Sequence, residues 1–204
     1  MIKGERIYIE SLQLSDVYQM MNWKKAEDIL SREYHFLTTK DGNVKGWYEA
    51  RIARKNMKSY SVKTYSGKVI GFISIRDINR LFKTAVLGIT FDMNYVNCGY
   101  GTESLRIFLD YYFNELKMRT LFLDVARHNK RAIRCYENLG FEHVRQYYAR
   151  LEDEYYDAVI EELKERKEEE FRQSFWIVGP FIMLGYYKMR LSKNMYNTVS
   201  TKTC

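Results

Sequence analysis

Two glycines, Gly99 and Gly101, lie between an apolar run, Val86 to Phe91, and a helical pattern that begins at Thr102. Because glycine has no side chain, the backbone N–H groups of such a loop can approach an anion closely. A helix that starts there adds its own unpaired N–H groups and the positive end of its dipole. The spacing therefore predicts a phosphate-binding loop, although an ordinary tight turn between a strand and a helix also produces it.

The elements around this loop are predicted from the spacing of apolar residues. From Thr102 to Leu116, apolar side chains recur every three or four positions, which indicates a helix with one buried face. A second apolar run, Thr120 to Val125, is interrupted only by Asp124 and is typical of a buried strand. Lys130 to Leu139 then predicts a second helix, which stops at Gly140, a favoured residue at a helix C-terminus.

Three short segments complete the pattern: Gly99-Tyr100-Gly101-Thr102-Glu103, Asn129-Lys130-Arg131-Ala132-Ile133 and Tyr136-Glu137-Asn138-Leu139-Gly140-Phe141. Together they resemble the GNAT superfamily of N-acetyltransferases, and within it most of all the branch typified by ribosomal-protein N-terminal acetyltransferases. The resemblance covers roughly Ile7 to Glu162. It implies a mixed α/β fold with a mostly antiparallel, twisted sheet of about seven strands, split between its fourth and fifth strands and flanked by helices. It also implies an acetyl-CoA-dependent enzyme, without a metal, that acetylates a primary amine of a protein N-terminus or a small molecule.

In that family the pyrophosphate of acetyl-CoA lies on the loop that opens the helix, and the pantothenate arm lies in the split of the sheet. The family's loop pattern is Gln or Arg, two free positions, Gly, a free position, then Gly or Ala, and it aligns with Val96 to Gly101. Val96 departs from the pattern and Cys98 stands where a basic residue is frequent, so side chains help the phosphates less while the amides remain. The resemblance implies a cofactor-binding set of Ile89, Thr90 and Phe91 (backbone, thioester arm), Asn97, Cys98, Gly99, Tyr100, Gly101 and Thr102 (pyrophosphate), and Asn129 (arm).

Acetyl transfer needs a base that deprotonates the ammonium and an acid that protonates the departing thiolate. The resemblance puts Tyr136 where many relatives carry the acid, and a phenol with an ordinary pKa of about 10 keeps its proton at neutral pH. Tyr136 also lies on the apolar face of its helix, so a plain core residue is the alternative. Asp124 stands where one type of ribosomal-protein acetyltransferase carries a catalytic Glu; the alternative is a strand-end carboxylate satisfied by backbone amides. Glu10, Glu33 and His35 are further candidates for the base.

Two other classes of protein share part of this pattern. Gly99 and Gly101 with Asp124 downstream imitate a dinucleotide-binding fingerprint, but Ser104 replaces the third glycine and hairpin-like strands precede the loop. A non-catalytic acyl-CoA-binding module would keep the loop without the chemistry, and Val96 leaves that alternative open. The acceptor is not specified, but acidic residues on segments that border the acceptor cleft in relatives suit a cationic amine: Glu27, Asp28, Glu33, Glu152, Asp153 and Glu154.

The composition excludes several classes of protein. The chain has 204 residues, enough for one domain with a sizeable core, and 46% of them are hydrophobic, which excludes a disordered chain. Its three cysteines, Cys98, Cys135 and Cys204, lack CxxC spacing, so neither a disulfide framework nor a zinc site is predicted. The formal charge of +7 suits an anionic cofactor, and without a basic, aromatic stripe it does not predict nucleic-acid binding. No signal peptide and no membrane-spanning run stands out, so we expect a cytoplasmic protein.

The remaining segments predict the rest of the fold and an unusual tail. Helices are expected after Ser15 and from Val44 to Ile52, and strands at Glu5–Leu12, Tyr60–Tyr65, Val69–Ile78, Thr84–Met93, Phe141–Leu151 and Tyr155–Glu162. We expect an acetyltransferase domain over residues 1–172 and an apolar extension over 173–204. Because so apolar a segment is a liability when exposed, it is expected to pack on its own core, or on a second copy of the chain in a homodimer.

Overall fold

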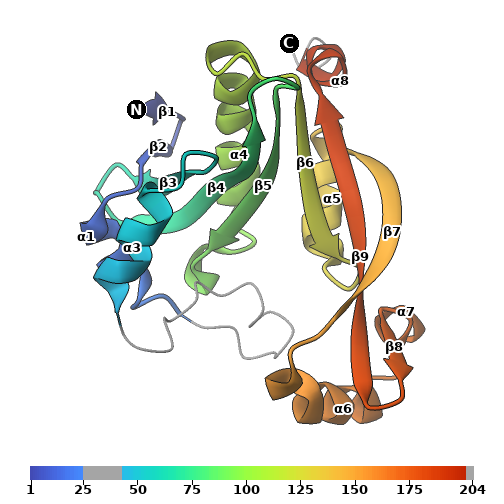
Figure 1. The fold of residues 1–204 in the computed structure, drawn as a ribbon. Helices are drawn as coiled ribbons and strands as arrows, with labels where there is room; N and C mark the ends of the chain where they lie inside the picture. Colours follow the sequence, from blue (N-terminus) through green and yellow to red (C-terminus); the bar gives the residue numbers. More distant parts are fainter. Residues whose placement is uncertain (25–42, 201–204) are drawn as a thin grey trace. The chain divides into compact units, whose positions relative to one another are not determined.

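The computed structural model describes residues 1–24 and 43–200, and these form two compact units. The first unit comprises residues 1–24 and 43–121 of the described chain, and the second comprises residues 122–200. Figure 1 follows the chain through the elements of both. The base candidates Glu33 and His35 and the acidic residues Glu27 and Asp28 lie outside the described residues.

The first unit is built on an antiparallel sheet whose strands follow one another in chain order. The strands are β1 (Ile2–Lys3), β2 (Ile7–Ser11), β3 (Lys58–Thr64), β4 (Val69–Asn79) and β5 (Thr84–Phe91), and each pairs with the next. The strands predicted for this region are therefore confirmed. The hairpin between β3 and β4 turns at Gly67, whose φ of 84° suits a residue without a side chain.

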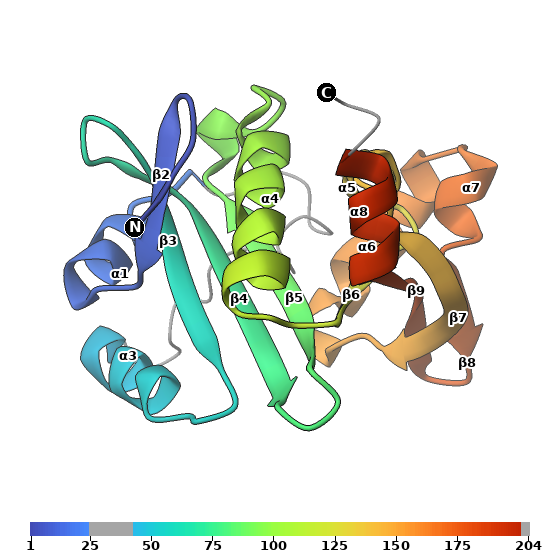
Figure 2. The ribbon, with the colours of Figure 1, turned by 90° about the horizontal axis from the view of Figure 1, so that it is seen from above.

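Helices cover both faces of this sheet (Figure 2). α4 (Tyr100–Asp110) packs Phe108 edge-on against Tyr60 of β3, with the ring centroids 5.3 Å apart. Tyr60 pairs with Ile73, so its side chain and that of Phe72 point to opposite faces. On the Phe72 face lie α1 (Leu14–Met20) and α3 (Val44–Ile52), which contributes Trp47. Because β4 is covered on both sides, its residues 69–75 are buried without alternation.

The helix that the sequence predicts after the glycine loop is confirmed, with small changes at its ends. It begins at Tyr100 and, after Asp110, continues as one π-helical segment, η2 (Tyr111–Glu115). Its inward face carries the largest fully buried side chains of the unit, Phe108, Tyr112 and Phe113. This packing anchors the helix, so its N-terminal turn has a fixed position relative to β5.

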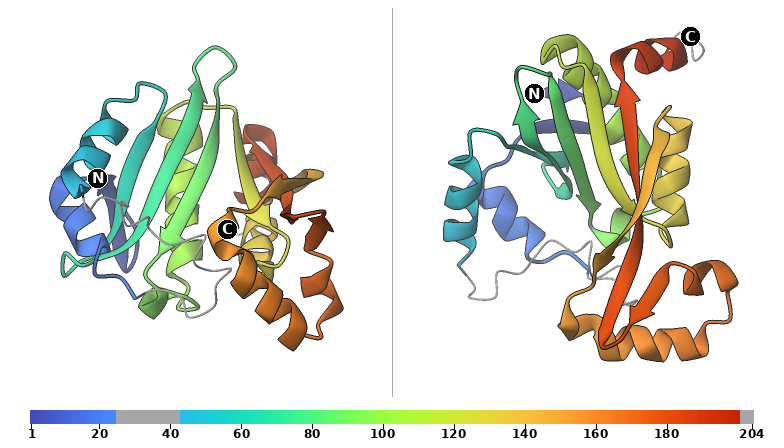
Figure 3. Two further views of the ribbon diagram at one scale, coloured as in Figure 1. Left: turned by 60° about the horizontal axis from the view of Figure 1, so that its bottom comes forward. Right: turned by 45° about the vertical axis from the view of Figure 1, so that its right-hand side comes forward.

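The second unit begins within β6 (Thr120–Ala126), at residue 122. Its other elements are α5 (Lys130–Asn138), β7 (Glu142–Arg150), α6 (Tyr156–Glu165), α7 (Glu169–Arg172), β8 (Phe175–Val178), β9 (Phe181–Ser192) and α8 (Lys193–Ser200). β9 pairs antiparallel with β7 along its length, and its first part also pairs with β8 (Figure 3). Just beyond β6, the backbone N–H of Arg127 donates to Gly185 of β9 at 2.9 Å. β9 is therefore the central strand of this unit.

The predicted strand over residues 155–162 is wrong, because this segment forms the end of a short 3-10 turn, η3 (Asp153–Tyr155), and then α6. Val159, which is fully buried, and the half-buried Leu163 lie one helical turn apart. The glutamates and the lysine between and after them are good helix formers, and this favours a helix with one buried side.

The apolar tail supplies the strand that pairs with β7, in place of residues 155–162. Within β9 the side chains of Ile182, Leu184, Met189 and Leu191 are buried. The turn between β8 and β9 contains Gly179, with φ 56°, followed by Pro180. Residues 173–200 thus belong to the second compact unit, while the predicted domain boundary after residue 172 stays a prediction.

Candidate active site

The loop after β5 enters α4 through two residues with positive φ. Asp92, only 3% exposed, closes the preceding turn by accepting a hydrogen bond from the N–H of Asn94 at 3.0 Å. Asn97 then adopts a φ of 64° and Gly99 a φ of 81°. This region of φ is strained for most residues but not for glycine. The conformation of the turn therefore explains why residue 99 is a glycine.

The N-terminus of α4 is not closed by a side chain. Gly99 is the N-cap residue, so it offers no side-chain acceptor. Across residues 1–24 and 43–200, no acceptor takes the backbone N–H groups of residues 97–101. The first N–H groups of a helix lack partners within the helix and carry the positive end of its dipole. The predicted phosphate-binding loop therefore has the backbone that such a site requires.

The ring of Phe91 packs between two glycines and supports this loop. A Cβ atom on Gly71 of β4 would lie 2.6 Å from that ring, whereas a Cβ atom on Gly101 would lie at an ordinary 3.7 Å. Packing inside the protein therefore requires glycine at position 71 but not at position 101. A bare backbone at Gly101 fits a diphosphate group that rests directly on the amides.

The other cofactor-binding residues predicted in this unit are adjacent to the loop. Ile89, Thr90 and Phe91 form the end of β5, where they pair with β4 and their side chains are half-buried. Tyr100 packs edge-on against Tyr95, with the ring centroids 5.8 Å apart. The remaining members, Cys98 and Thr102, lie in the exposed part of the loop and in the first turn of α4.

Arg6, which no sequence motif marks, also lies at this loop. Its Nε donates to Oε2 of Glu103 at 2.8 Å, and its Nη1 donates to the carbonyl of Cys98 at 3.1 Å. The guanidinium carbon lies 4.4 Å from the centre of the Tyr100 ring. Arg6 and Glu103 are 97 positions apart in the chain, so no local spacing signals the contact.

In the second unit, α5 carries Asn129 and Tyr136. Asn129 is the N-cap residue, and its side-chain oxygen accepts a hydrogen bond from the N–H of Ala132 at 3.1 Å. The side-chain NH2 group of Asn129 is not used by this cap. Tyr136 is 8% exposed and packs on Phe141, with the ring centroids 5.7 Å apart. Burial raises the pKa of Tyr136 above its ordinary value, so the phenol keeps its proton at neutral pH.

Asp124 lies in β6 and is half-buried, whereas its neighbours Leu123 and Val125 are fully buried. Successive side chains of a strand point to opposite faces, so Asp124 lies on the face away from these two. The predicted strand over Thr120 to Val125 is confirmed. Whether Asp124 acts as the base stays a prediction.

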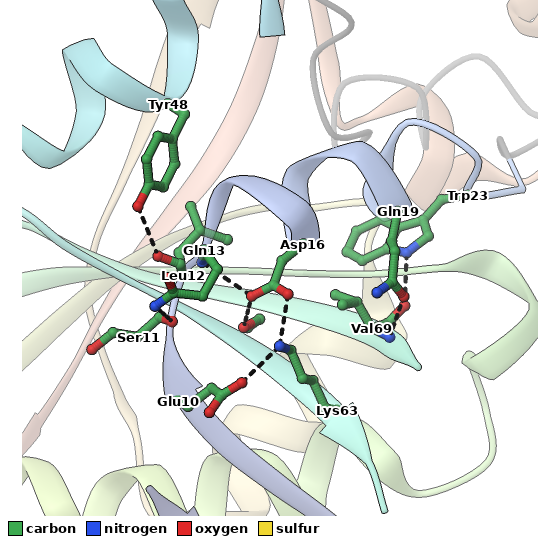
Figure 4. Close-up of polar contacts among 11 residues, drawn as sticks. Glu10, Ser11, Leu12, Gln13, Asp16, Gln19, Trp23, Tyr48, Lys63 and Val69 are labelled. Carbon is green, nitrogen blue, oxygen red and sulfur yellow. Dashed lines mark hydrogen bonds and ion pairs between the residues drawn. The ribbon is translucent and has the colours of Figure 1, made fainter. Parts of the chain in front are cut away.

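Glu10, a further base candidate, belongs to a buried ion cluster (Figure 4). Nζ of Lys63 lies 2.7 Å from Oε1 of Glu10 and 2.6 Å from Oδ1 of Asp16, and Ser61 donates to the other Asp16 oxygen at 2.6 Å. Burial by itself would lower the pKa of Lys63, but the two carboxylates raise it overall, so the ammonium stays charged. Lys63 of β3 links Glu10 of β2 to Asp16 of α1, which favours a structural role for Glu10 in joining α1 to the sheet.

The described part of the chain shows neither a metal cluster nor a membrane helix. No three His, Cys, Asp or Glu side chains in residues 1–24 and 43–200 gather closely enough to hold a metal ion. Of the helices in these ranges, none is long and apolar enough to cross a membrane. Within the same ranges, neither Cys98 nor Cys135 forms a disulfide bond.

Residues 6–142 match the acetyltransferase (GNAT) domain family. Over 150 residues the chain is 26% identical to a probable N-acetyltransferase, YjcK, of Bacillus subtilis, a match that covers 69% of this chain and 83% of that protein. It is 28% identical over 94 residues to spermidine N(1)-acetyltransferase of Escherichia coli, and this match covers 46% of the chain and 50% of the relative's length.

A solved structure of spermidine N-acetyltransferase from Vibrio cholerae, in complex with CoA and spermine, has the same fold. The TM-score is 0.69 at 18% identity, over 94% of this chain and 98% of that one. This confirms the predicted mixed α/β fold with a mostly antiparallel, open sheet and flanking helices. The relatives named here do not confirm the predicted placement in the ribosomal-protein branch. Because the family match extends over more than half of the 204 residues, the chain belongs to the GNAT family and is an acetyltransferase that uses acetyl-CoA as its cosubstrate.

Proposed function

We propose that the loop 97–102 holds the pyrophosphate of acetyl-CoA and that the enzyme acetylates a primary amine of a small, polycationic acceptor. The observation that carries the proposal is the row of open N–H groups at residues 97–101, at the start of α4. Such a row binds the oxygens of a diphosphate without any charged side chain. Ile89, Thr90 and Phe91, at the end of β5, are proposed to hold the thioester arm through their backbone.

Polyamines are the acceptor class that we propose first. The support is that both the Escherichia coli relative and the Vibrio cholerae structure carry the name of spermidine acetyltransferases. In the second unit, the exposed Glu152 and Asp153 lie between β7 and α6, where acidic side chains attract a polycation. Asp153 also pairs with Arg150 at 2.7 Å, so Glu152 is the stronger candidate of the two.

For the chemical step we assign Tyr136 as the general acid and Asp124 as the base. The amine nitrogen forms a bond to the acetyl carbon, the bond between that carbon and sulfur breaks, and the sulfur leaves as a thiolate. Tyr136 gives this thiolate its proton, which its raised pKa keeps in place at neutral pH. Asp124 takes the proton of the ammonium, directly or through a water molecule. The side-chain NH2 group of Asn129 is proposed to donate to the cofactor arm.

An acceptor panel tests the reaction. Purified protein is mixed with acetyl-CoA and spermidine, spermine, an aminoglycoside or a peptide with a free N-terminus. Release of CoA is measured, and mass spectrometry identifies the acetylated product. We expect a polyamine to be the best substrate. Acetylation of the peptide alone would overturn the proposed acceptor class, and CoA binding without acetylation of any amine would favour a non-catalytic binding module.

Two substitutions test the cofactor loop by titration calorimetry with acetyl-CoA. Gly99→Glu and Gly101→Glu place a side chain and a negative charge where the diphosphate is proposed to rest, so both should abolish binding. Gly179→Glu is the matched control, because Gly179 also has a positive φ, of 56°, with no atom within 4 Å of an added Cβ. Unchanged affinity in both loop variants would place the cofactor elsewhere.

A homodimer and a cytoplasmic location are also proposals. The hairpin of β8 and β9 exposes Trp176 by 57%, Ile177 by 59% and Phe181 by 39%. Groups of large apolar side chains on a surface are usual at contacts between protein chains. Sedimentation at micromolar concentration decides the first proposal, since the mass of a single chain would contradict a dimer.

A further inference from the structure

The loop before α4 lacks a basic side chain of its own. Val96 and Cys98 occupy the positions at which a cation would assist the phosphates. A diphosphate carries at least two negative charges, and hydrogen bonds from a charged donor are roughly twice as strong as those from neutral ones. The loop amides are neutral donors, so a cation close to them would add substantially to affinity.

The guanidinium of Arg6 lies directly against this loop. A Cβ atom on Gly99 would stand 3.3 Å from Nη2 of Arg6, so the guanidinium covers one side of that glycine. Nε and Nη1 are held by Glu103 and by the Cys98 carbonyl. Nη2, in contrast, donates to no acceptor within residues 1–24 and 43–200. Nη2 of Arg6 is therefore available to a ligand next to the unpaired N–H groups of the loop.

The charges around Arg6 also suit an anion. Glu103 lies in the first turn of α4, where its carboxylate would repel a phosphate if it were left alone. Arg6 neutralises it through two contacts, from its backbone N–H and from Nε, each 2.8 Å long. The same carboxylate raises the pKa of Arg6, which is charged at every relevant pH.

Stability by itself is a weak reason for this ion pair. The Arg6 side chain is 46% exposed, and ion pairs open to solvent contribute little to folding. The Lys63 cluster in the same unit is different, since Lys63 is 10% and Asp16 is 1% exposed there. The contacts of Arg6 with Glu103 and with the Cys98 carbonyl fix the direction of the guanidinium and do not use Nη2.

We propose that Arg6 is a phosphate ligand of acetyl-CoA, with Nη2 donating to an oxygen of the pyrophosphate on the loop 97–102 and with Glu103 as its positioning residue. This inference rests on the proposed function of that loop. Arg6 then takes the role of the basic residue that positions 96 and 98 do not provide.

The main test compares Arg6→Gln with Arg106→Gln. Arg106 is exposed on the same helix, α4, so its loss changes the net charge equally without touching the loop. By calorimetry, Arg6→Gln should weaken acetyl-CoA binding by about 10- to 100-fold, the usual range for a charged hydrogen bond, and Arg106→Gln by less than about twofold. Equal affinities of Arg6→Gln and the wild type would overturn the proposal.

Cosubstrates with fewer phosphates locate the effect. With S-acetylpantetheine, which has no phosphate, Arg6→Gln and the wild type should show the same kcat/KM. With acetyl-dephospho-CoA, which keeps the pyrophosphate but lacks the 3′-phosphate, the full loss should persist. A loss that also appears with S-acetylpantetheine would show that Arg6 only shapes the loop. A loss that vanishes with acetyl-dephospho-CoA would refute the assignment to the pyrophosphate.

Glu103→Gln tests whether Arg6 binds phosphate or only supports the loop through its ion pair. If Arg6 binds phosphate, Glu103→Gln should leave acetyl-CoA affinity equal or higher, because the amide oxygen of the new side chain can still accept from Nε of Arg6 while the repulsive negative charge is gone. If the pair merely braces the loop, Glu103→Gln should lose as much affinity as Arg6→Gln, which would overturn the proposal. Thermal melts verify folding, and the double variant Arg6→Gln/Glu103→Gln replaces the single one should an unpaired Glu103 prevent folding. Arg6→Lys, which keeps the charge but not the fork, should recover part of the affinity.

Gly99→Glu distinguishes failure of this inference from failure of the proposed function. If Gly99→Glu abolishes acetyl-CoA binding while Arg6→Gln binds like the wild type, the loop stands and only the role of Arg6 falls. If Gly99→Glu binds like the wild type, both proposals fall together.

Discussion

The helices that follow β5 and β6 begin in different ways. Gly99 opens α4 with a φ of 81° and no side-chain cap, whereas Asn129 opens α5 with a φ of −80° and caps the N–H of Ala132. Both make the same first backbone bond, from Glu103 to Gly99 and from Ile133 to Asn129, each 3.1 Å long. The cap residue therefore decides whether the first N–H groups stay open to an external anion.

The two helices consequently suit different work. α4 offers its backbone, because a left-handed glycine leaves the N-terminal amides bare and close to the surface. In α5 the side chain of Asn129 satisfies one N-terminal N–H group, and the helix presents side chains, among them Tyr136, whose phenol keeps its proton because burial raises its pKa. Substitutions in either helix test whether these two roles hold.

The largest effect is expected from Tyr136→Phe, which removes the proposed acid of α5. We expect kcat to fall by about 10²- to 10⁴-fold while acetyl-CoA affinity stays the same, because the ring and its packing are kept. Since burial raises the pKa of Tyr136, the wild-type enzyme should retain the acid throughout the neutral range and lose it only above about pH 10. Steady-state kinetics over a pH series measures both.

Tyr112→Phe is the control for removing a buried phenol. Its hydroxyl donates to the Thr120 carbonyl at 2.8 Å, so its loss should lower stability by about 1 kcal/mol without changing kcat. A near-normal kcat in Tyr136→Phe would mean that Tyr136 is only a core residue and that α5 does not supply the acid.

A Cβ atom at the start of α4 should have the next largest effect. Gly99→Ala strains a φ of 81° by about 1–2 kcal/mol and brings a methyl group within 3.3 Å of Arg6, so we expect about tenfold weaker acetyl-CoA binding. Gly179→Ala carries a similar strain, at a φ of 56°, in the β8–β9 turn. Calorimetry and thermal melts should show a stability loss in both variants and an affinity loss in Gly99→Ala alone. Equal affinities would mean that the open backbone does not serve the cofactor.

A smaller effect is expected when the cap of α5 is removed. Asn129→Ala should lower stability by about 1 kcal/mol, the usual cost of a lost N-cap. Asn43→Ala is the matched variant, since Asn43 caps α3 through Gly46 with a bond of 2.8 Å. If the side-chain NH2 group of Asn129 also holds the cofactor arm, KM for acetyl-CoA should rise only in Asn129→Ala. The same KM in both variants would limit Asn129 to capping.

The smallest effect is expected from a basic residue in the loop of α4. Cys98→Lys restores a charge beside the open amides, and a single exposed charge near a helix N-terminus should change phosphate affinity by only about two- to fivefold. The gain should disappear at high salt, because exposed charges are screened. A gain of tenfold or more would show that Arg6 contributes little, and a loss would place the phosphate away from Cys98.

Features with a short-range cause were predictable from the sequence. The left-handed turn at Gly99 depends on one residue without a Cβ atom, and the α4 helix depends on apolar residues a turn apart. The same reasoning was wrong for residues 155–162, because a short run of mixed polarity fits a strand and a helix equally well. Burial of Val159, which settles the choice, depends on packing that the local pattern does not contain.

The sequence by itself therefore determined the glycine loop, the helices on either side of β6 and the membership of a family, all of which depend on residues a few positions apart. Only the tertiary structure decided that Arg6 meets Glu103 across 97 positions, that β9 rather than residues 155–162 pairs with β7, and that Tyr136 is buried enough to raise its pKa. These features depend on the free energy of closing long stretches of chain and on the free energy of excluding water from buried groups. Both arise from the packed core as a whole, so no single stretch of sequence contains them.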